Sequence, residues 1–338
     1  MSYSCEEADD YHDLVDDYQT KNRRNPPLRH QSSSFVRVCD LNLPDMKELC
    51  VSIPPWKQHD SAEPKGKWMG LDVMASSPRT DAPQRSPYAP LVLESLVQAG
   101  LQAISNKCMW TPVGSTAKLA KERQRRLQSN NGQPRGDEGT AKDTTVLVWS
   151  GSFTHGAYGH ELPVVKCSGF VAMSADYLVH LLIDSNRVHS YNKNSTGRKD
   201  LVILDNTLHS SNKENAGAMT KITKSYAKLS FIPMTMEFLS LLHVRKLKPE
   251  DGFGEGYIVV SRAVDQDSRN STKEGTVVRS EVLLNVHLIT KIPGMEDKKC
   301  EMTNINHLKS PLIPSFFAAK ICLSAATSFI NDIRALCK

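Results

Sequence analysis

Apolar residues recur at two different spacings along the chain, and each spacing predicts a different kind of element. Between Tyr88 and Lys107 they recur every three or four residues, which predicts an amphipathic helix with Pro90 near its start. From about residue 143 short β-branched runs predict strands. Ser174 is the expected N-cap of one helix that ends near Val188. Because most strands follow one another directly, they predict an antiparallel sheet, with strands at 145–150, 164–171, 201–204, 219–224, 238–247, 257–264, 276–289 and 300–308.

The strand at 276–289 has the most regular alternation. Its even positions, such as Val282, Leu284 and Val286, are mostly apolar, whereas Asn285 and His287 stand at odd positions. Such a pattern predicts one apolar and one wetter face, so another element should cover the even-numbered face.

The C-terminal segment is the expected cover. Pro314 is suited to open a helix, and apolar residues then recur at threes and fours from Phe317 to Leu336. Small residues fill the middle of this helix, at 324–328. They favour either close packing on the sheet or a space left for a ligand.

Composition divides the chain in two. Residues 1–84 carry 10 Lys and Arg against 14 Asp and Glu, a net charge of −4, and hold 8 of the 18 prolines. We expect them to be mostly disordered, because such a segment buries too little apolar surface to offset its ordering entropy. Residues 85–338 form the expected folded domain. No 18-residue apolar run or sustained heptad is present, which excludes a polytopic membrane protein and a coiled coil.

The segment 112–142 is predicted to be a basic, low-complexity loop inserted into this domain. Its Lys118–Leu127 stretch holds five positive charges against one negative. A solvated basic turn is the plain interpretation; nucleic-acid binding and contact with anionic lipid headgroups are the alternatives.

Residues that could carry chemistry do not form a known catalytic or metal-binding pattern. The eight cysteines lack zinc spacing and indicate reduced thiols in the cytoplasm. His155, His160 and Glu161 are not spaced as ligands on a helix, and the glycines at 252, 254 and 256 precede a strand, as in a turn. We therefore expect no metal, no cofactor and no catalytic residues.

Several motifs in the C-terminal part resemble one known family. They are the segments 256–264, 275–284 and 292–294, the Ile313-Pro314 pair before the last helix, and the strand-to-helix segment 170–178. The helix at 91–107 followed by Trp110 adds to them. In order and spacing these segments resemble the START family of lipid-transfer domains, and more narrowly its sterol-carrying branch, over residues 85–338.

The resemblance implies an α+β helix-grip fold, in which a curved antiparallel sheet surrounds a long C-terminal helix and encloses an apolar lipid tunnel. It also implies that the loop 265–275 acts as a gate. Leu242 stands where some members of the family place a basic residue, and no arginine occupies the expected inner faces. A bound phosphate is therefore disfavoured. Ile313, Phe316 and Phe317 are the residues best suited to touch a membrane.

The predicted function is that of an intracellular, non-enzymatic carrier or sensor of one lipid, with sterol preferred over fatty acid and phospholipid. We expect a cytoplasmic monomer that contacts membranes transiently and does not bind nucleic acid. The alternatives are a regulatory scaffold and, on the same fold, a hydrolase or cyclase. The candidate lipid-binding residues are Phe238, Ser240, Leu242, Val259, Ser261, Ser280, Val282, Leu284, Phe317, Ile321 and Ala325.

Overall fold

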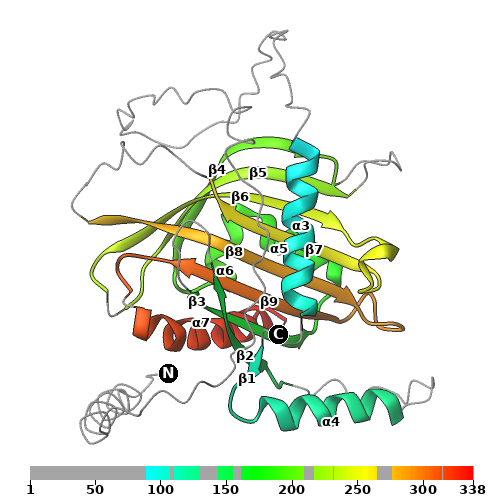
Figure 1. Ribbon diagram of the computed structural model, residues 1–338. Helices are drawn as coiled ribbons and strands as arrows, with labels where there is room; N and C mark the ends of the chain where they lie inside the picture. Colours follow the sequence, from blue (N-terminus) through cyan, green and yellow to red (C-terminus); the bar gives the residue numbers. More distant parts are fainter. Residues whose placement is uncertain are drawn as a thin grey trace, which may run out of the picture. The chain divides into compact units, whose positions relative to one another are not determined.

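One curved sheet organises the structure. The computed structural model describes residues 89–106, 110–129, 144–154, 161–208, 217–230, 232–264, 276–313 and 315–337. Among these residues, nine strands pair in the order β1-β2-β3-β9-β8-β7-β6-β5-β4, all antiparallel except for a short parallel pairing of β6 with β8 (Figure 1). The strands are β1 (Thr111–Pro112), β2 (Leu147–Thr154), β3 (Glu161–Val171), β4 (Ser195–Asn206), β5 (Ala218–Ala227), β6 (Thr235–Lys246), β7 (Gly256–Ala263), β8 (Val277–Lys291) and β9 (Cys300–Lys309).

Helices lie on both faces of this sheet. On its outer face lies α3 (Ala89–Ser105); α5 (Ala175–Ile183), α6 (Val188–Tyr191) and the long α7 (Ser315–Ala335) lie on its inner face (Figure 1). Two short 3₁₀ turns, η2 (Ser185–Arg187) and η3 (Pro249–Asp251), join neighbouring elements. A curved antiparallel sheet held against a C-terminal helix is the helix-grip arrangement, so the predicted fold class is confirmed. The sheet stays open, with β1 and β4 at its edges.

The outer face packs against α3 at very short range. Leu96 and Val97 are fully buried there, in one cluster with Val260 and Val286. Gly100 allows the helix to approach, because a Cβ at this position would lie 3.1 Å from Val260 Cγ1 and 3.2 Å from Val286 Cγ2. The absence of a side chain on Gly100 therefore sets the spacing between helix and sheet.

The inner face is covered from two directions. Ser174 caps α5 as expected, with its side chain accepting a hydrogen bond from the Tyr177 amide. At the other end of the sheet, Ala326 and Ile330 of α7 pack on β3, and Arg334 donates hydrogen bonds to the backbone carbonyls of Phe170 and Thr145. These contacts hold the C-terminal half of α7 against β3.

A β-bulge in β8 overturns one prediction. The register with β9 shifts between Val282 and Leu284, so the side chains before and after this point lie on opposite faces. Leu284 and Val286 consequently pack under α3 on the outer face, whereas Asn285 and His287 point inward. The prediction that α7 covers the even-numbered positions of this strand is wrong beyond the bulge, because simple alternation does not reveal an extra residue.

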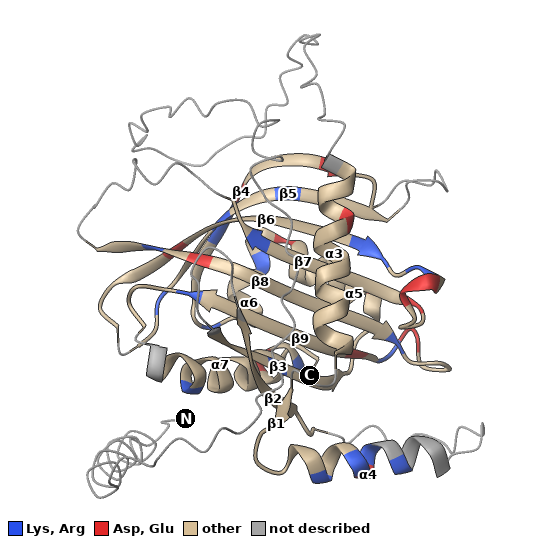
Figure 2. Cartoon of the chain, in the orientation of Figure 1, with Lys and Arg blue, Asp and Glu red and all other residues tan. Residues whose placement is uncertain are grey.

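The basic segment after Trp110 is also different from the prediction. Instead of a loop, residues 116–129 form the helix α4 (Thr116–Ser129). Arg123 anchors it, with its guanidinium 3.8 Å from the centre of the Phe170 ring and 3.2 Å from Glu301. The exposed residues Lys118, Lys121 and Arg125 form a basic face on its other side, and α4 stands out as a largely basic element in Figure 2.

Three predictions concern segments outside the described residues. They are the disorder of residues 1–84, the gate at 265–275 and the turn that holds His155 and His160. Within the described part of the chain, no helix combines the length and the apolar composition needed to cross a bilayer. The glycine-rich segment after β6 is the expected turn, with Gly252 and Gly254 in the left-handed conformation.

Candidate functional site

A cavity of about 390 Å³ lies between the inner face of the sheet and helices α6 and α7. Its size is within the range of pockets that bind small molecules. The strands β4 to β9 form one wall, and the side chains of Ile321, Ala325 and Phe329 on α7 form another. The small residues of α7 therefore serve both expectations: Ala326 packs closely on β3, and Ala325 leaves room in the cavity.

The structure places most of the candidate residues on this cavity. Phe238, Ser240, Leu242, Val259, Ser261, Val282, Ile321 and Ala325 line it. Three candidates lie elsewhere. Leu284 is beneath α3 because of the bulge, Ser280 donates a hydrogen bond to Ser310 beside the cavity, and Phe317 is half-buried outside its lining. Lipid binding by the residues that line the cavity stays a prediction.

One end of the cavity is apolar. Met236, Phe238 and Val282 form a buried cluster there, with Leu308 and Ile321 packed against it. The strand β6 contributes Met236 and Phe238 to this end, because its even-numbered side chains point inward as expected. A hydrocarbon chain placed here contacts mainly aliphatic and aromatic groups, with the hydroxyl of Ser225 opposite Phe238 on the neighbouring strand.

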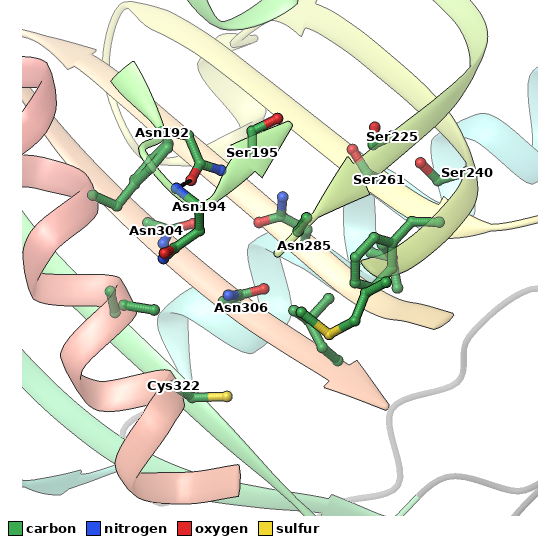
Figure 3. A pocket seen from close by; sticks show the side chains of 18 of the residues that line it. Asn192, Asn194, Ser195, Ser225, Ser240, Ser261, Asn285, Asn304, Asn306 and Cys322 are labelled. Carbon is green, nitrogen blue, oxygen red and sulfur yellow. Dashed lines mark hydrogen bonds between the residues drawn. The ribbon is translucent and has the colours of Figure 1, made fainter. Parts of the chain in front are cut away.

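The other end carries amides. Asn192 and Asn194, just after α6, meet Asn304 on one side of the cavity, and Asn285 and Asn306 lie next to them (Figure 3). The register explains the group on the sheet, since β8 and β9 place Asn285 opposite Asn306 and His287 opposite Asn304. Side chains opposite one another on neighbouring strands share a face.

Three polar atoms in this group have no hydrogen-bond partner among the described residues, although each is buried. They are Asn285 Oδ1, His287 Nδ1 and Asn304 Oδ1. Asn285 Nδ2 donates to His287 Nε2 at 3.3 Å, so Nδ1 is the nitrogen that carries the proton. Phe329 of α7 stacks on the imidazole, with ring centres 5.5 Å apart.

His287 is neutral in this setting. Burial and the positive charge of Arg198 together lower its pKa to about 4, and the nearby side chain of Asn304 acts against this shift. Cys322, which also lines the cavity, is a poor nucleophile because burial raises its thiol pKa to about 11. In the described part of the chain no three metal-ligating side chains come together. His287 and Cys322 thus present neutral groups to the cavity.

Arg198 corrects another expectation. This arginine lines the cavity from β4, although none was expected on an inner face, because the strand was predicted to begin only at Leu201. Its Nε donates to Ser185 Oγ at 2.9 Å and its Nη2 to the Leu182 carbonyl at 2.8 Å. Two sides of the guanidinium are therefore used to hold η2 and the end of α5.

A buried lysine adds to these contacts of Arg198 with η2 and α5. Lys221 Nζ is 2.8 Å from Asp200 and donates to the Ile183 carbonyl at 2.6 Å. Burial lowers the pKa of Lys221, and its hydrogen bond to Asp200 acts against that shift. The network joins the edge strand β4 and its neighbour β5 to the helical segment that covers the amide end of the cavity.

The sequence prediction missed the amides for an identifiable reason. Asn285 and His287 were assigned to a wet outer face, since nothing in the composition marks the bulge. Asn304 and Asn306 stand two residues apart in a predicted strand and therefore share a face, and this spacing was the available signal.

No protein-family model and no curated protein matches the sequence. Solved structures do match in fold. The human StarD13 (DLC2) lipid transfer and protein localization domain is 15% identical, with 65% of this chain and 96% of that chain covered and a TM-score of 0.44. Human STARD10 is 16% identical, with 63% and 77% covered and a TM-score of 0.45. The Zhui aromatase/cyclase of a Streptomyces species also matches, at 7% identity, with 52% and 92% covered and a TM-score of 0.28. At these identities and TM-scores the similarities do not indicate what the chain binds.

Proposed function

We propose that this chain binds one lipid molecule in its cavity and carries it, or senses it, without chemical conversion. The observation that supports the proposal is the division of the cavity into an apolar end and an amide end, which matches an amphiphile. Moving a tail of about sixteen carbons into water costs on the order of 13 kcal/mol at ~0.8 kcal/mol per CH₂. A protein that offers the tail an apolar wall removes most of that cost.

The sequence predicts sterol as the preferred ligand because the expected inner faces are apolar and contain no arginine. The cavity wall includes five asparagines and Arg198, so this premise is wrong. A single sterol hydroxyl satisfies only part of such a surface. We propose a long-chain amphiphile with a polar head as the ligand.

The direct experiment is to purify the full chain from cells, extract it and identify bound lipid by mass spectrometry. We expect about one lipid per chain. Ala325→Trp should reduce uptake of a fluorescent fatty acid by the stripped protein at least several-fold, because Ala325 lines the cavity. Ser324→Trp is the matched control, since Ser324 is exposed on the same helix. Protein that is empty and takes up neither fluorescent fatty acid, sterol nor phospholipid would contradict the proposal.

Transient contact with a membrane accompanies this function in our proposal. The basic face of α4 supports it, with Lys118, Lys121 and Arg125 exposed at a spacing of three and four residues. Such a face attracts an anionic surface by about 1 kcal/mol per basic residue. The same face suits a protein partner in the scaffold alternative.

A further inference from the structure

We infer that the cavity selects lipids whose head is uncharged and carries at least two hydrogen-bond donors, and that Asn285, His287 and Asn304 read this head. The inference rests on the proposed lipid-binding function and goes further by naming the head group. Its starting point is the set of three buried polar atoms without a partner, Asn285 Oδ1, His287 Nδ1 and Asn304 Oδ1.

Unpaired polar groups of this kind are costly to an empty protein. Buried donors and acceptors are normally paired, and an exception calls for an explanation. Here three exceptions occur on two residue pairs of β8 and β9 that are neighbours on the inner face, and all three belong to residues that line the cavity. A ligand that pairs with all three explains why the groups are retained.

The chemistry of these atoms defines the ligand. Both amide oxygens accept hydrogen bonds, and the protonated Nδ1 of His287 donates one. His287 and Asn304 face each other across the strand pair, so one hydroxyl between them can accept from the imidazole and donate to the amide. A second hydroxyl or N–H group satisfies Asn285 Oδ1. The head therefore needs two donors and one acceptor.

The surrounding charges disfavour an anionic head. The two amide oxygens carry partial negative charge and would repel a phosphate or carboxylate. Arg198 and Lys309 are the cations of the lining. Arg198 Nε and Nη2 already donate to Ser185 and to the Leu182 carbonyl, and Lys309 follows Leu308, which packs on the apolar cluster. Asp332 also lines the cavity, in an ion pair of 2.8 Å with Lys193. A neutral head meets none of these obstacles.

The positions of the groups are fixed before any ligand binds. Phe329 stacks on His287 and also meets Tyr191 edge to face, at 5.9 Å between ring centres. Asn285 Nδ2 holds the other imidazole nitrogen. Fixed groups lose little conformational freedom on binding and discriminate well between heads.

Three lipids with the same oleoyl tail, together with cholesterol, test the selectivity on the full chain after bound lipid has been removed. They are 1-oleoylglycerol, which has two hydroxyls, methyl oleate, which has no donor, oleate, which is anionic, and cholesterol, which has one hydroxyl. We expect 1-oleoylglycerol to have a Kd at least about tenfold lower than each of the others, in line with two additional hydrogen bonds. Tighter binding of oleate or of 1-oleoyl lysophosphatidic acid would overturn the inference in favour of an anionic head at Arg198.

Asn285→Leu and Asn304→Leu, made separately and together, test whether these two amides bind the head group. The double variant should lose about tenfold in affinity for 1-oleoylglycerol and should keep its affinity for methyl oleate. Asn186→Leu, at an exposed position that does not line the cavity, is the matched control and should preserve the selectivity.

The outcomes separate the two proposals. If the native chain binds none of the probes, both the lipid-binding function and the inference fail. If it binds all probes equally, or if the Leu variants keep the selectivity of the native chain, the function stands and the inference is wrong. Should the double variant fail to fold, the ranking of the four lipids on the native chain still decides.

Discussion

Two buried histidines make the stability of the folded chain depend on acidity. Burial lowers the pKa of His287 to about 4, and burial together with Arg245 does the same for His243, which also bonds Thr220 on the outer side of the sheet. Both pKa values lie below the ordinary 6.5, so the unfolded chain takes up these protons first. The stability that the neutral imidazoles provide is therefore complete above pH 6.5 and is lost as the pH falls towards 4.

Chemical denaturation between pH 7 and pH 4 should show this loss, at about 3 kcal/mol for each imidazole. His243→Gln should give a shallower decline than the native chain, because one of the two titrating groups is gone. His189→Gln replaces an exposed histidine and serves as the control. Equal slopes for the native chain and His243→Gln would show that His243 does not contribute to the decline.

Single residues also define how far the sequence predicts the cavity. The lining residues of β6 were found because strict alternation holds from Met236 to Leu242. On β8 the same rule failed at one residue, since a bulge inverts the faces without changing the composition. Alternation is thus a sound guide only while the register is continuous.

Helices and strands were predicted more accurately than the residues that line the cavity. Long amphipathic segments such as α3 and α7 have a period that only a helix explains. The helix α4 was missed because its length is mostly polar and its inward contacts are made by Arg123, through Phe170 and Glu301. A stacked arginine contributes packing that hydrophobic periodicity does not count.

The basic face of α4 leads to a prediction about membranes. Replacing Lys118, Lys121 and Arg125 by Gln should abolish most binding to vesicles that contain phosphatidylserine, by about 3 kcal/mol in total, because each basic residue contributes about 1 kcal/mol. Co-sedimentation at two salt concentrations measures it. The control triple Lys199, Lys228 and Lys246→Gln removes equal charge from other exposed sites. The same loss in both triples would assign the attraction to net charge instead of to α4.

The two faces of the sheet have different roles: packing on the outer face stabilises the fold, and the inner face lines the cavity. The outer face and α3 form a dense core, and the inner face and α7 leave a cavity. Gly100→Leu should lower the free energy of unfolding by about 2 kcal/mol, since the helix must move away from Val260 and Val286. Lipid uptake at a temperature where the variant is folded should stay unchanged.

Thermal melting and fluorescent fatty-acid uptake on the same samples check this separation. Gln102→Leu adds the same side chain at an exposed position of α3 and should leave both quantities as they are. A loss of uptake in folded Gly100→Leu protein would mean that the two faces are mechanically coupled.

The open sheet has a consequence for the behaviour of the protein at high concentration. No described strand pairs with the outer edge of β4, and an unpaired edge can recruit a second chain. The strand β4 is irregular, with three register shifts in its pairing with β5, and it carries Arg198, Lys199, Asp200 and Asp205. A broken, charged edge offers no continuous template for another strand. The irregularity of β4 therefore disfavours pairing between the edges of two chains, and a straightened β4 would offer a template for fibre growth.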